Sequence, residues 1–294
     1  MIFITGATGF IGKNLLKKLL EANLLIRALA RDKSRINKVN NLEVIEGDLL
    51  DKENLFKVMQ NVDVVIHLAA VVKASSAYEY NKTNIEGTKN LVEACLKNKV
   101  KKIIYISSLD AGLDNPNCYG ESKALGEIII RESGIDYIIL RPSLVYGRES
   151  DVIVMLAGLI KKLPVIPVVG NGGAILQPIY VEDVCEIIIK LLDGDIKNKI
   201  YYLAGEERVS IDGFIDKIAK IYSKKVIKMH VPLWLIFLPL KLYNFVIKNS
   251  VFTYDSLKLS NTNKICDISE IKSLFNFKFL NLDEGLAKTL GKSL

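Results

Sequence analysis

The sequence predicts an α/β fold in which a doubly wound parallel sheet is joined to a smaller, irregular α/β lobe toward the C-terminus. Half of the 294 residues are hydrophobic and a quarter are charged, which excludes disordered, collagen-like and low-complexity chains. Up to about Arg141, short and almost continuous apolar runs alternate with segments of helical periodicity. A parallel sheet that helices cover on both faces requires strands of this kind.

Six apolar runs are predicted to form the strands of this sheet: Met1–Thr5, Leu24–Ala30, Leu42–Ile45, Val62–Leu68, Ile103–Ser107 and Asp136–Arg141. The segments between them carry the crossover helices. The first helix is expected over Lys13–Ala22, where Leu15, Leu16, Leu19 and Leu20 recur with helical spacing.

After Arg141 this alternation ends, because prolines and glycines interrupt the chain at Pro142, Pro164, Pro167, Gly170, Gly172, Gly173 and Pro178. We therefore expect a larger domain over residues 1–165, to which segments around 177–205 return. Residues 166–294 are expected to form the smaller lobe.

The charges exclude some classes of function. The net charge of +7 is spread along the chain, and the nearest thing to a basic block lies at Lys97, Lys99, Lys101 and Lys102. No arginine or aromatic residue is interleaved with these lysines, so we interpret them as a solvated helix end and expect no nucleic-acid partner.

The cysteines and histidines limit the chemistry further. The four cysteines are widely separated and form no CxxC pair, so we expect neither a disulfide framework nor a metal site, and a reducing cytoplasm as the location. His67 and His230 are the only histidines. Any catalytic triad that needs histidine would have to use one of these two.

No export signal is visible at the N-terminus, and no transmembrane span is expected. The most apolar segment, Val231–Ile247, is interrupted by Pro232, Pro239, Lys241 and Asn244, and it falls short of the ~20 clean residues that a span needs. We interpret it as a buried or surface-lying helix; peripheral membrane contact stays open as its alternative role.

The turn after the first strand predicts dinucleotide binding. It reads Thr5-Gly6-Ala7-Thr8-Gly9-Phe10-Ile11-Gly12 and leads into the first helix. Glycine is required where the chain turns tightly, where backbone touches a pyrophosphate and where helix packs on strand. The helix N-terminus offers unpaired N–H groups to the anion.

The ends of the second and third strands indicate which dinucleotide is bound. Proteins that select NAD usually place an acidic residue after the second strand, whereas this chain has Ala30-Arg31-Asp32. The guanidinium of Arg31 suits a 2′-phosphate, so NADP is preferred over NAD, with a plain surface arginine as the alternative. Asp48, after the third strand, can accept a hydrogen bond from the adenine amino group.

A tyrosine and a lysine four residues apart, Tyr119 and Lys123, begin another expected helix. They share one helix face, so the ammonium can lower the pKa of the phenol from ~10 toward neutrality and make it a proton acceptor. Ser107 and Ser108 end the preceding strand at the sheet edge where such folds bind ligands.

Eight segments, in order over about the first two thirds of the chain, resemble the extended short-chain dehydrogenase/reductases of the NAD-dependent epimerase/dehydratase family. They are Thr5–Gly12, Gly47–Leu49, His67–Ala70, Thr83–Leu91, Ile106–Ser108, Tyr119–Lys123, Arg141–Gly147 and Gln177–Val184. The resemblance implies a Rossmann-type sheet, with the smaller lobe binding the substrate. The chain is also similar to the atypical branch of this family that includes the NADPH-binding accessory subunit of respiratory complex I. This similarity lies in Arg31, in the sequence of Gln177–Val184 and in the short interval from Ser108 to Tyr119.

The same resemblance implies residue roles. Tyr119 would be the general acid/base, Lys123 its partner and a ligand of the nicotinamide ribose, Ser108 a hydrogen-bond donor to the reacting oxygen, and Asn84 part of the proton relay. The cofactor would be held by Gly6, Thr8, Gly9, Phe10, Ile11, Gly12, Arg31, Asp48, Leu49, Ala69, Ala70, Tyr119, Lys123 and Pro142. His67 is interpreted as a strand residue packed beneath the cofactor.

Two departures from the family pattern concern the substrate. The 4,6-dehydratases carry Asp-Glu after the catalytic hydroxyl residue, whereas Leu109-Asp110 follows Ser108, which argues against dehydration. Many nucleotide-sugar epimerases carry an arginine that meets the substrate diphosphate, where this chain has Leu176-Gln177.

We therefore expect an NAD(P)-dependent oxidoreductase or epimerase that transfers hydride at a secondary alcohol or keto carbon, on a sugar or sugar nucleotide. One alternative is a catalytically silent NADPH-binding structural or sensor protein. Another is an NADPH-dependent ketone reductase resembling dihydroflavonol reductase. We expect the chain to be a homodimer or a monomer. A dimer would form through the segments Ser76–Lys97 and Tyr119–Ser133.

Overall fold

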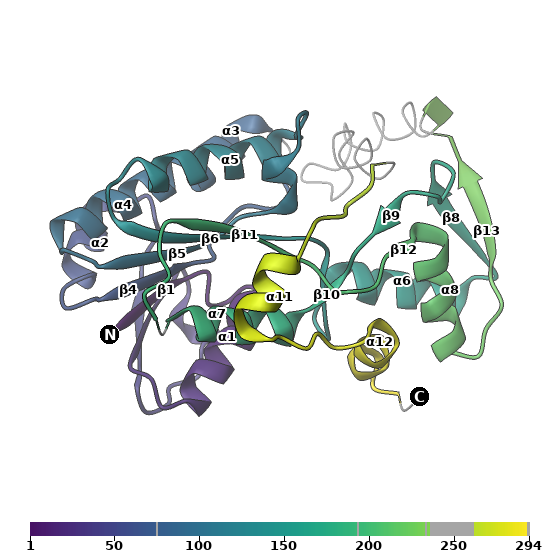
Figure 1. Cartoon of the computed structure of the whole chain (residues 1–294), viewed down its shortest axis with the longest axis horizontal. Helices are drawn as coiled ribbons and strands as arrows, with labels where there is room; N and C mark the ends of the chain where they lie inside the picture. Colours follow the sequence, from purple (N-terminus) through teal and green to yellow (C-terminus); the bar gives the residue numbers. More distant parts are fainter. Residues whose placement is uncertain (75, 193, 233, 236–261, 293–294) are drawn as a thin grey trace. The chain divides into compact units, whose positions relative to one another are not determined.

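The structure, a computed structural model, describes the chain apart from residues 75, 193, 233, 236–261 and 293–294 (Figure 1). It divides into two compact units, the first made of Met1–Pro142 with Val184–Tyr202 and the second of Ser143–Asp183 with Leu203–Leu294. The first segment of the first unit ends at Pro142, because β6, a long strand of the central sheet, ends at that proline. The boundary expected from the sequence was residue 165. Most of the apolar segment Val231–Ile247 lies outside the described residues.

Seven strands form the central sheet, in the order β11-β6-β5-β4-β1-β2-β3. Their bounds are β1 Ile2–Thr5, β2 Ile26–Ala30, β3 Leu42–Glu46, β4 Val64–His67, β5 Lys102–Ile106, β6 Asp136–Pro142 and β11 Lys199–Leu203. All ladders from β6 through to β3 are parallel. The six predicted strands are thus present, and their carboxyl ends meet at one edge of the sheet.

Helices cover both faces of this sheet. They are α1 Phe10–Glu21, α2 Lys52–Val58, α3 Ala77–Tyr80, α4 Gly87–Lys97, α5 Cys118–Arg131 and α7 Val181–Leu192. Figure 1 shows α1 and α7 on one face and α2, α4 and α5 on the other. The doubly wound arrangement predicted from the sequence is confirmed, and α1 begins three residues before its predicted start, directly after Gly9.

Three short segments lie at the carboxyl edge or next to it. They are the 3-10 turns Lys33–Arg35 and Leu109–Gly112 and the π-helical segment Asn81–Glu86, which leads directly into α4. The core of this unit joins strand residues such as Phe3 and Ile103, both fully buried, to Leu55 of α2 and Leu91 of α4. The strands are apolar on both faces because helices cover both.

The described residues of the second unit form three two-stranded ribbons and four helices. The ribbons pair β7 Val145–Tyr146 with β10 Ile179–Tyr180, β9 Ile175–Leu176 with β12 Val209–Ser210, and β8 Val165–Val169 with β13 Ile227–Val231. The helices are α6 Asp151–Lys162, α8 Ile211–Ile221, α11 Ser269–Phe275 and α12 Leu282–Leu290. Its core includes Ile160 of α6, Phe214 of α8 and Leu286 of α12.

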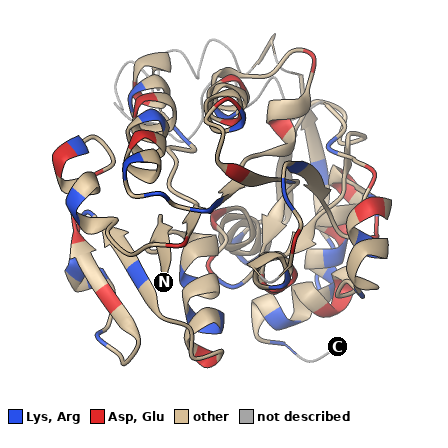
Figure 2. Ribbon diagram, turned by 60° about the vertical axis from the view of Figure 1, so that its left-hand side comes forward, with Lys and Arg blue, Asp and Glu red and all other residues tan. Residues whose placement is uncertain are grey.

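Basic and acidic residues are interspersed along the helices of both units (Figure 2). Among the described helices, none has both the length and the apolar composition that a bilayer crossing needs. In the described ranges, no cluster of histidine, cysteine and carboxylate side chains is placed to hold a metal ion. None of the four cysteines, all of which lie in the described ranges, is joined in a disulfide.

Candidate active site

The glycine turn after β1 brings three backbone segments into close contact. Gly6 has a φ of +76°, and a Cβ atom at this position would lie 2.6 Å from the amide nitrogen of Ala69, which follows β4. A Cβ at Gly12, in the first turn of α1, would collide with the carbonyl oxygen of Gly6. Only glycine fits at these two positions, so the turn lies tight against both the helix and the neighbouring strand.

The N-terminus of α1 fits an anionic ligand. Gly9 is its N-cap, no side chain caps the helix, and the first turn contains no acidic residue. The first N–H groups of a helix have no partner within it, and the helix dipole adds a positive partial charge there. This twelve-residue helix and the glycine cradle suit the pyrophosphate of a dinucleotide, which Thr8, Gly9, Phe10 and Ile11 would hold through their backbone.

The chain after β2 separates the roles of Arg31 and Asp32. A carboxylate oxygen of Asp32 accepts hydrogen bonds from the backbone nitrogen and the hydroxyl of Ser34, at 3.0 and 2.6 Å. These hydrogen bonds hold the pKa of Asp32 below its ordinary value. Asp32 therefore caps the next turn, while Arg31 is exposed at the carboxyl edge.

The predicted adenine and nicotinamide contacts follow the other strands of the sheet. Asp48 accepts a hydrogen bond from the Leu50 amide at 2.9 Å, and the buried Leu49 accepts one at its carbonyl from Asn90 at 3.1 Å. Ala69 donates its amide hydrogen to the Thr5 hydroxyl at 3.3 Å. These positions, with the adjoining Ala70, lie at the carboxyl edge.

The hydroxyl groups of Ser108 and Tyr119 meet at this edge. Ser108 follows β5, and its Oγ accepts a hydrogen bond from the Asp110 amide at 3.1 Å. Tyr119 lies in the first turn of α5, whose N-cap Asn117 accepts a hydrogen bond from the Gly120 amide at 2.8 Å. The Ser108 side chain is hydrogen-bonded to the Tyr119 phenol. The serine–tyrosine pair is therefore assembled by the end of a strand and the start of a helix.

The phenol of Tyr119 is shifted away from ionisation. Burial raises its pKa, as do the nearby Asp110 and Tyr80, and the Ser108 hydrogen bond acts in the opposite direction. The ring of Tyr80 lies 6.2 Å away, tilted by 53°. From the four-residue spacing, Lys123 was expected to lower the pKa of Tyr119 toward neutrality. The structure shows the opposite direction, because the loss of solvation at the phenol dominates.

Lys123 is buried and lies over a different ring. Its Nζ is 4.0 Å from the ring centroid of Tyr105, which belongs to β5. Burial lowers the pKa of Lys123 to about 7, and the charge of Glu127 acts against that fall. The ammonium is therefore close to losing its proton at neutral pH, so it does not offset the burial of Tyr119.

Asn84 links the π-helical segment to α5. Its side chain accepts a hydrogen bond from the Val71 amide at 2.7 Å and donates to the Val71 carbonyl and the Ser122 hydroxyl, both at 2.9 Å. Ser122 is the residue before Lys123. π-Helical turns are frequent at functional sites, and this one places a buried amide beside α5.

A buried ion pair beneath α5 was missed by the sequence analysis. Glu127, one helical turn after Lys123, accepts hydrogen bonds from Arg141 at 2.9 and 2.6 Å and one from the Ser107 hydroxyl at 2.5 Å. Arg141 also donates to the Tyr202 hydroxyl at 2.7 Å. The four-residue spacing from Lys123 was a signal that could have identified Glu127. This network joins α5 to the ends of β5 and β6.

The buried His67 joins β1 and β4 to α4. Thr88 donates its hydroxyl hydrogen to the Asn84 carbonyl at 2.6 Å, so it must accept a hydrogen bond from Nε2–H of His67, 3.0 Å away. Nδ1 of His67 then accepts the Thr5 hydroxyl hydrogen at 2.6 Å. Burial, with the charge of Lys123, lowers the pKa of His67 to about 3, which keeps the ring neutral.

Pro142 and Gln177 are both buried. Pro142 is the buried last residue of β6. In the second unit, the Gln177 side chain is buried, donates to the Gly205 carbonyl at 2.8 Å and accepts from the Cys266 amide at 3.0 Å. Gln177 is therefore engaged at both ends of its amide within the second unit.

The chain is similar to a known protein family, to a named relative and to a solved structure. The sequence model described as "NAD dependent epimerase/dehydratase family" matches residues 2–204. A Methanocaldococcus jannaschii protein named "Putative UDP-glucose 4-epimerase" is 30% identical over 250 residues, which cover 74% of this chain and 80% of that protein. The solved structure "MoeE5 in complex with UDP-glucuronic acid and NAD" has a TM-score of 0.79 at 22% identity and covers 99% of this chain and 97% of that one.

Two further relatives differ widely in their names. Subunit 9 of the mitochondrial NADH dehydrogenase [ubiquinone] 1 alpha subcomplex from Dictyostelium discoideum is 26% identical over 223 residues, 73% of this chain. A "Ceramide reductase" from Caulobacter vibrioides is 30% identical over 186 residues, 62% of this chain. The matches span 62% and 58% of these two relatives, which is less than two thirds of each.

Proposed function

The chain belongs to the NAD-dependent epimerase/dehydratase family, and from that premise we propose that it is an NAD(P)-dependent oxidoreductase or epimerase acting at a secondary alcohol or keto carbon. The substrate we propose first is a sugar or sugar nucleotide. The observation that carries the proposal is the hydrogen-bonded pair Ser108 and Tyr119, which lies at the same sheet edge as the glycine cradle.

In this proposal Tyr119 is the general acid/base. For oxidation, its Oη takes the hydroxyl proton of the substrate while the carbinol C–H bond breaks and hydride leaves the carbon; for reduction, Tyr119 returns the proton to the carbonyl oxygen. Ser108 hydrogen-bonds the reacting oxygen. A nicotinamide cofactor, when bound, would supply or take up the hydride in this chemistry.

Because the pKa of Tyr119 is raised, the phenol holds its proton and can donate it to a carbonyl oxygen in the reductive direction. Lys123, whose pKa is about 7, would bind the nicotinamide ribose. Asn84 would belong to the proton relay through its contact with Ser122.

We propose NADP as the preferred cofactor. Arg31 is exposed just after β2, and Asp32 is already engaged by Ser34, so the guanidinium rather than the carboxylate is available to a 2′-phosphate. Isothermal titration of NADPH and NADH, repeated with Arg31→Ala, tests this preference. We expect the NADPH affinity to fall about tenfold and the NADH affinity to stay the same.

Gln177 favours a second candidate, a reductase of ketones that carry no diphosphate. Its side-chain amide already forms hydrogen bonds with Gly205 and Cys266. Many nucleotide-sugar epimerases carry an arginine where this chain has Leu176-Gln177. The two candidates share the same proton-transfer residues. They differ in the second unit, where the substrate would be recognised.

One experiment separates these functions. Purified protein is assayed for NADPH-linked turnover with UDP-sugars, keto-sugars and simple ketones, in the wild type, Tyr119→Phe and the control Tyr78→Phe, whose ring is exposed. We expect turnover on one class, loss of at least a hundredfold in Tyr119→Phe and full activity in Tyr78→Phe. Tight NADPH binding without turnover on any compound would overturn the enzymatic proposal in favour of a silent cofactor-binding protein.

We further propose that the chain acts in a reducing compartment such as the cytoplasm and forms a homodimer. Four widely separated cysteines that form no disulfide fit a reducing location. The helices α4 and α5 lie next to each other and carry the exposed apolar side chains Leu96, Leu125 and Ile128. An apolar face of this kind suits a symmetric contact between two copies.

A further inference from the structure

We propose that the second unit docks on an anionic lipid surface through one face of the β8–β13 ribbon. This inference is independent of the proposed activity. It rests on the alternation of side chains in the two paired strands and on the charges at their ends.

The two strands pair in parallel, with Val165 opposite Ile227 and Pro167 opposite Met229. Successive side chains of a strand point to opposite faces, so these four share one face of the ribbon. Ile227 and Met229 are 68% and 52% exposed, and Val165 and Pro167 are exposed as well. The face of the ribbon that is turned away from the core is therefore apolar.

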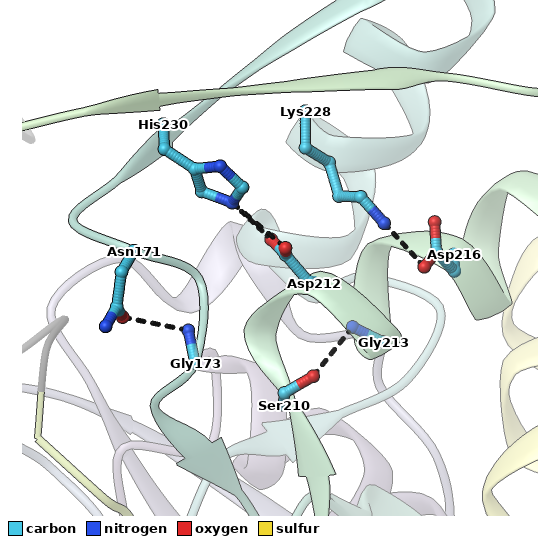
Figure 3. Close-up of polar contacts among 8 residues, drawn as sticks. All are labelled: Asn171, Gly173, Ser210, Asp212, Gly213, Asp216, Lys228 and His230. Atoms are coloured by element: carbon cyan, nitrogen blue, oxygen red, sulfur yellow. Dashed lines mark hydrogen bonds and ion pairs between the residues drawn. The ribbon is translucent and has the colours of Figure 1, made fainter.

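The opposite face carries the core and the charges. Ile166 and Val168 of β8 are buried in the core of the second unit. Figure 3 shows Lys228 and His230 pointing from β13 toward α8. Lys228 lies 2.6 Å from a carboxylate oxygen of Asp216, and His230 lies 2.9 Å from one of Asp212.

A tight turn fixes this inward arrangement. Gly172 has a φ of +70°, and a Cβ atom there would overlap the Asp212 carboxylate that contacts His230. Asp212 also donates its backbone hydrogen to the Gly172 carbonyl at 3.1 Å. The polar side chains of β13 are thus held against α8, so they do not lower the apolar character of the outer face.

Further exposed apolar residues adjoin the two strands in the chain. Leu163, before β8, is 44% exposed, and Trp234 and Leu235, after β13, are 74% and 48% exposed. Tryptophan is enriched where proteins meet the interface of a bilayer. An exposed row of large apolar residues on this scale marks an interaction surface rather than an ordinary protein exterior.

Charge identifies the partner. Residues 160–169 and 222–235 contain no acidic residue and five lysines, of which Lys161, Lys162, Lys224 and Lys225 are exposed. Because the strands are parallel, these four lie at the same end of the ribbon, and Lys224 donates to the Lys161 carbonyl at 2.5 Å. An apolar face bordered by lysines matches the acyl boundary and the anionic headgroups of a membrane surface.

Vesicle binding by the full chain tests this inference. Vesicles of phosphatidylcholine alone are compared with vesicles that contain roughly 30% phosphatidylserine, by co-sedimentation at low and high salt. We expect retention by the anionic vesicles, at least tenfold weaker retention by phosphatidylcholine alone, and release as salt screens the lysines.

Two variants and one control assign the binding to the ribbon. Ile227→Asp with Met229→Asp, and separately Lys161→Glu with Lys224→Glu, are each expected to weaken retention at least tenfold. The control Leu25→Asp changes an equally exposed apolar side chain in the first unit and is expected to bind like the wild type. Circular dichroism confirms that each variant is folded.

Wild-type retention by both double variants would overturn the proposal, as would equal retention on neutral and anionic vesicles. Loss of a concentration-dependent dimer in Ile227→Asp with Met229→Asp, without any vesicle binding in the wild type, would assign the face to a second copy of the chain instead. None of these outcomes depends on turnover, so a failure here is distinct from a failure of the proposed enzymatic function.

Discussion

At the scale of single residues, burial decides the chemistry of the candidate site. Tyr119 is half-buried and Lys123 is buried, and burial favours the uncharged form of each: the pKa of the tyrosine is raised and that of the lysine is lowered. Glu127 opposes the fall at Lys123, and Arg141 in turn balances Glu127. The site is therefore a row of ionisable groups in which the protonation of each depends on its neighbour.

The ion pair between Glu127 and Arg141 is predicted to be a main support of this chain. Glu127→Gln removes the negative charge while retaining the shape, and it leaves Arg141 half-paired in a buried place. We expect the free energy of unfolding to fall by roughly 3 kcal/mol, measured by urea denaturation.

The control for this prediction is Glu21→Gln, which breaks the exposed pair with Lys17 at 3.9 Å. This change is expected to cost less than about 0.5 kcal/mol. Equal losses in the two variants would contradict a special role for the buried pair.

His67 is predicted to make the protein sensitive to acid. Its pKa is lowered by burial from 6.5 to about 3. Between these values the unfolded chain binds a proton that the folded chain does not, so the free energy of unfolding falls as the pH falls, by up to about 1.4 kcal/mol per pH unit from this residue.

His67→Gln removes that titration. Denaturation at several pH values below 6.5 is expected to show a shallower decline in the variant than in the wild type, even though the lost hydrogen bonds to Thr5 and Thr88 lower its stability at neutral pH. Parallel declines in the two proteins would show that His67 is not the titrating group.

At the scale of elements, the site depends on how strand ends, glycine turns and helix starts fit together. Ser108 and Tyr119 meet because β5 ends and α5 begins beside the same short turn. The π-helical segment before α4 brings Asn84 to Ser122. The glycine turn places the N-terminus of α1 against the end of β4. A change in any of these junctions should affect binding before it affects the fold.

Gly12→Ala tests this expectation. A Cβ at Gly12 would push against the Gly6 carbonyl and displace the helix start from the turn. We expect at least a tenfold loss of dinucleotide affinity by isothermal titration calorimetry, while the circular dichroism of the folded protein stays the same.

Gly158→Ala provides the matched control, since Gly158 lies inside α6 with open space around it. This substitution is expected to leave dinucleotide affinity unchanged and to stabilise the protein by up to about 1 kcal/mol, because alanine favours the helix more than glycine does. Equal affinity losses in both variants would contradict the role given to the cradle.

At the scale of the whole molecule, the chain forms two units whose boundary is set by the sheet and not by length. The first unit closes at Pro142, and part of α7 and most of β11 return to it from later in the sequence. The proline- and glycine-rich stretch after Arg141 indicated that the architecture changes there. The residue at which it changes depends on where β6 ends, and pattern alone placed it some twenty residues late.

Self-association through α4 and α5 is the prediction at this scale. We expect a dimer in sedimentation velocity, and a monomer when Leu125→Asp and Ile128→Asp are combined, because charged residues would then lie in the apolar contact. Leu25→Asp, on an exposed apolar residue outside these helices, is expected to leave the dimer intact. A wild-type protein that is monomeric at all concentrations would contradict the prediction.

The sequence by itself determined the parallel sheet, the order of its first six strands along the chain, the glycine turn and the family. These features depend on local periodicity and on residues that are close together in the chain, which is why pattern reveals them. The tertiary structure alone decided which groups lie next to Lys123 and in which direction the pKa of Tyr119 moves. Both depend on the loss of water and on partners such as Tyr105 and Arg141, which folding brings from distant strands.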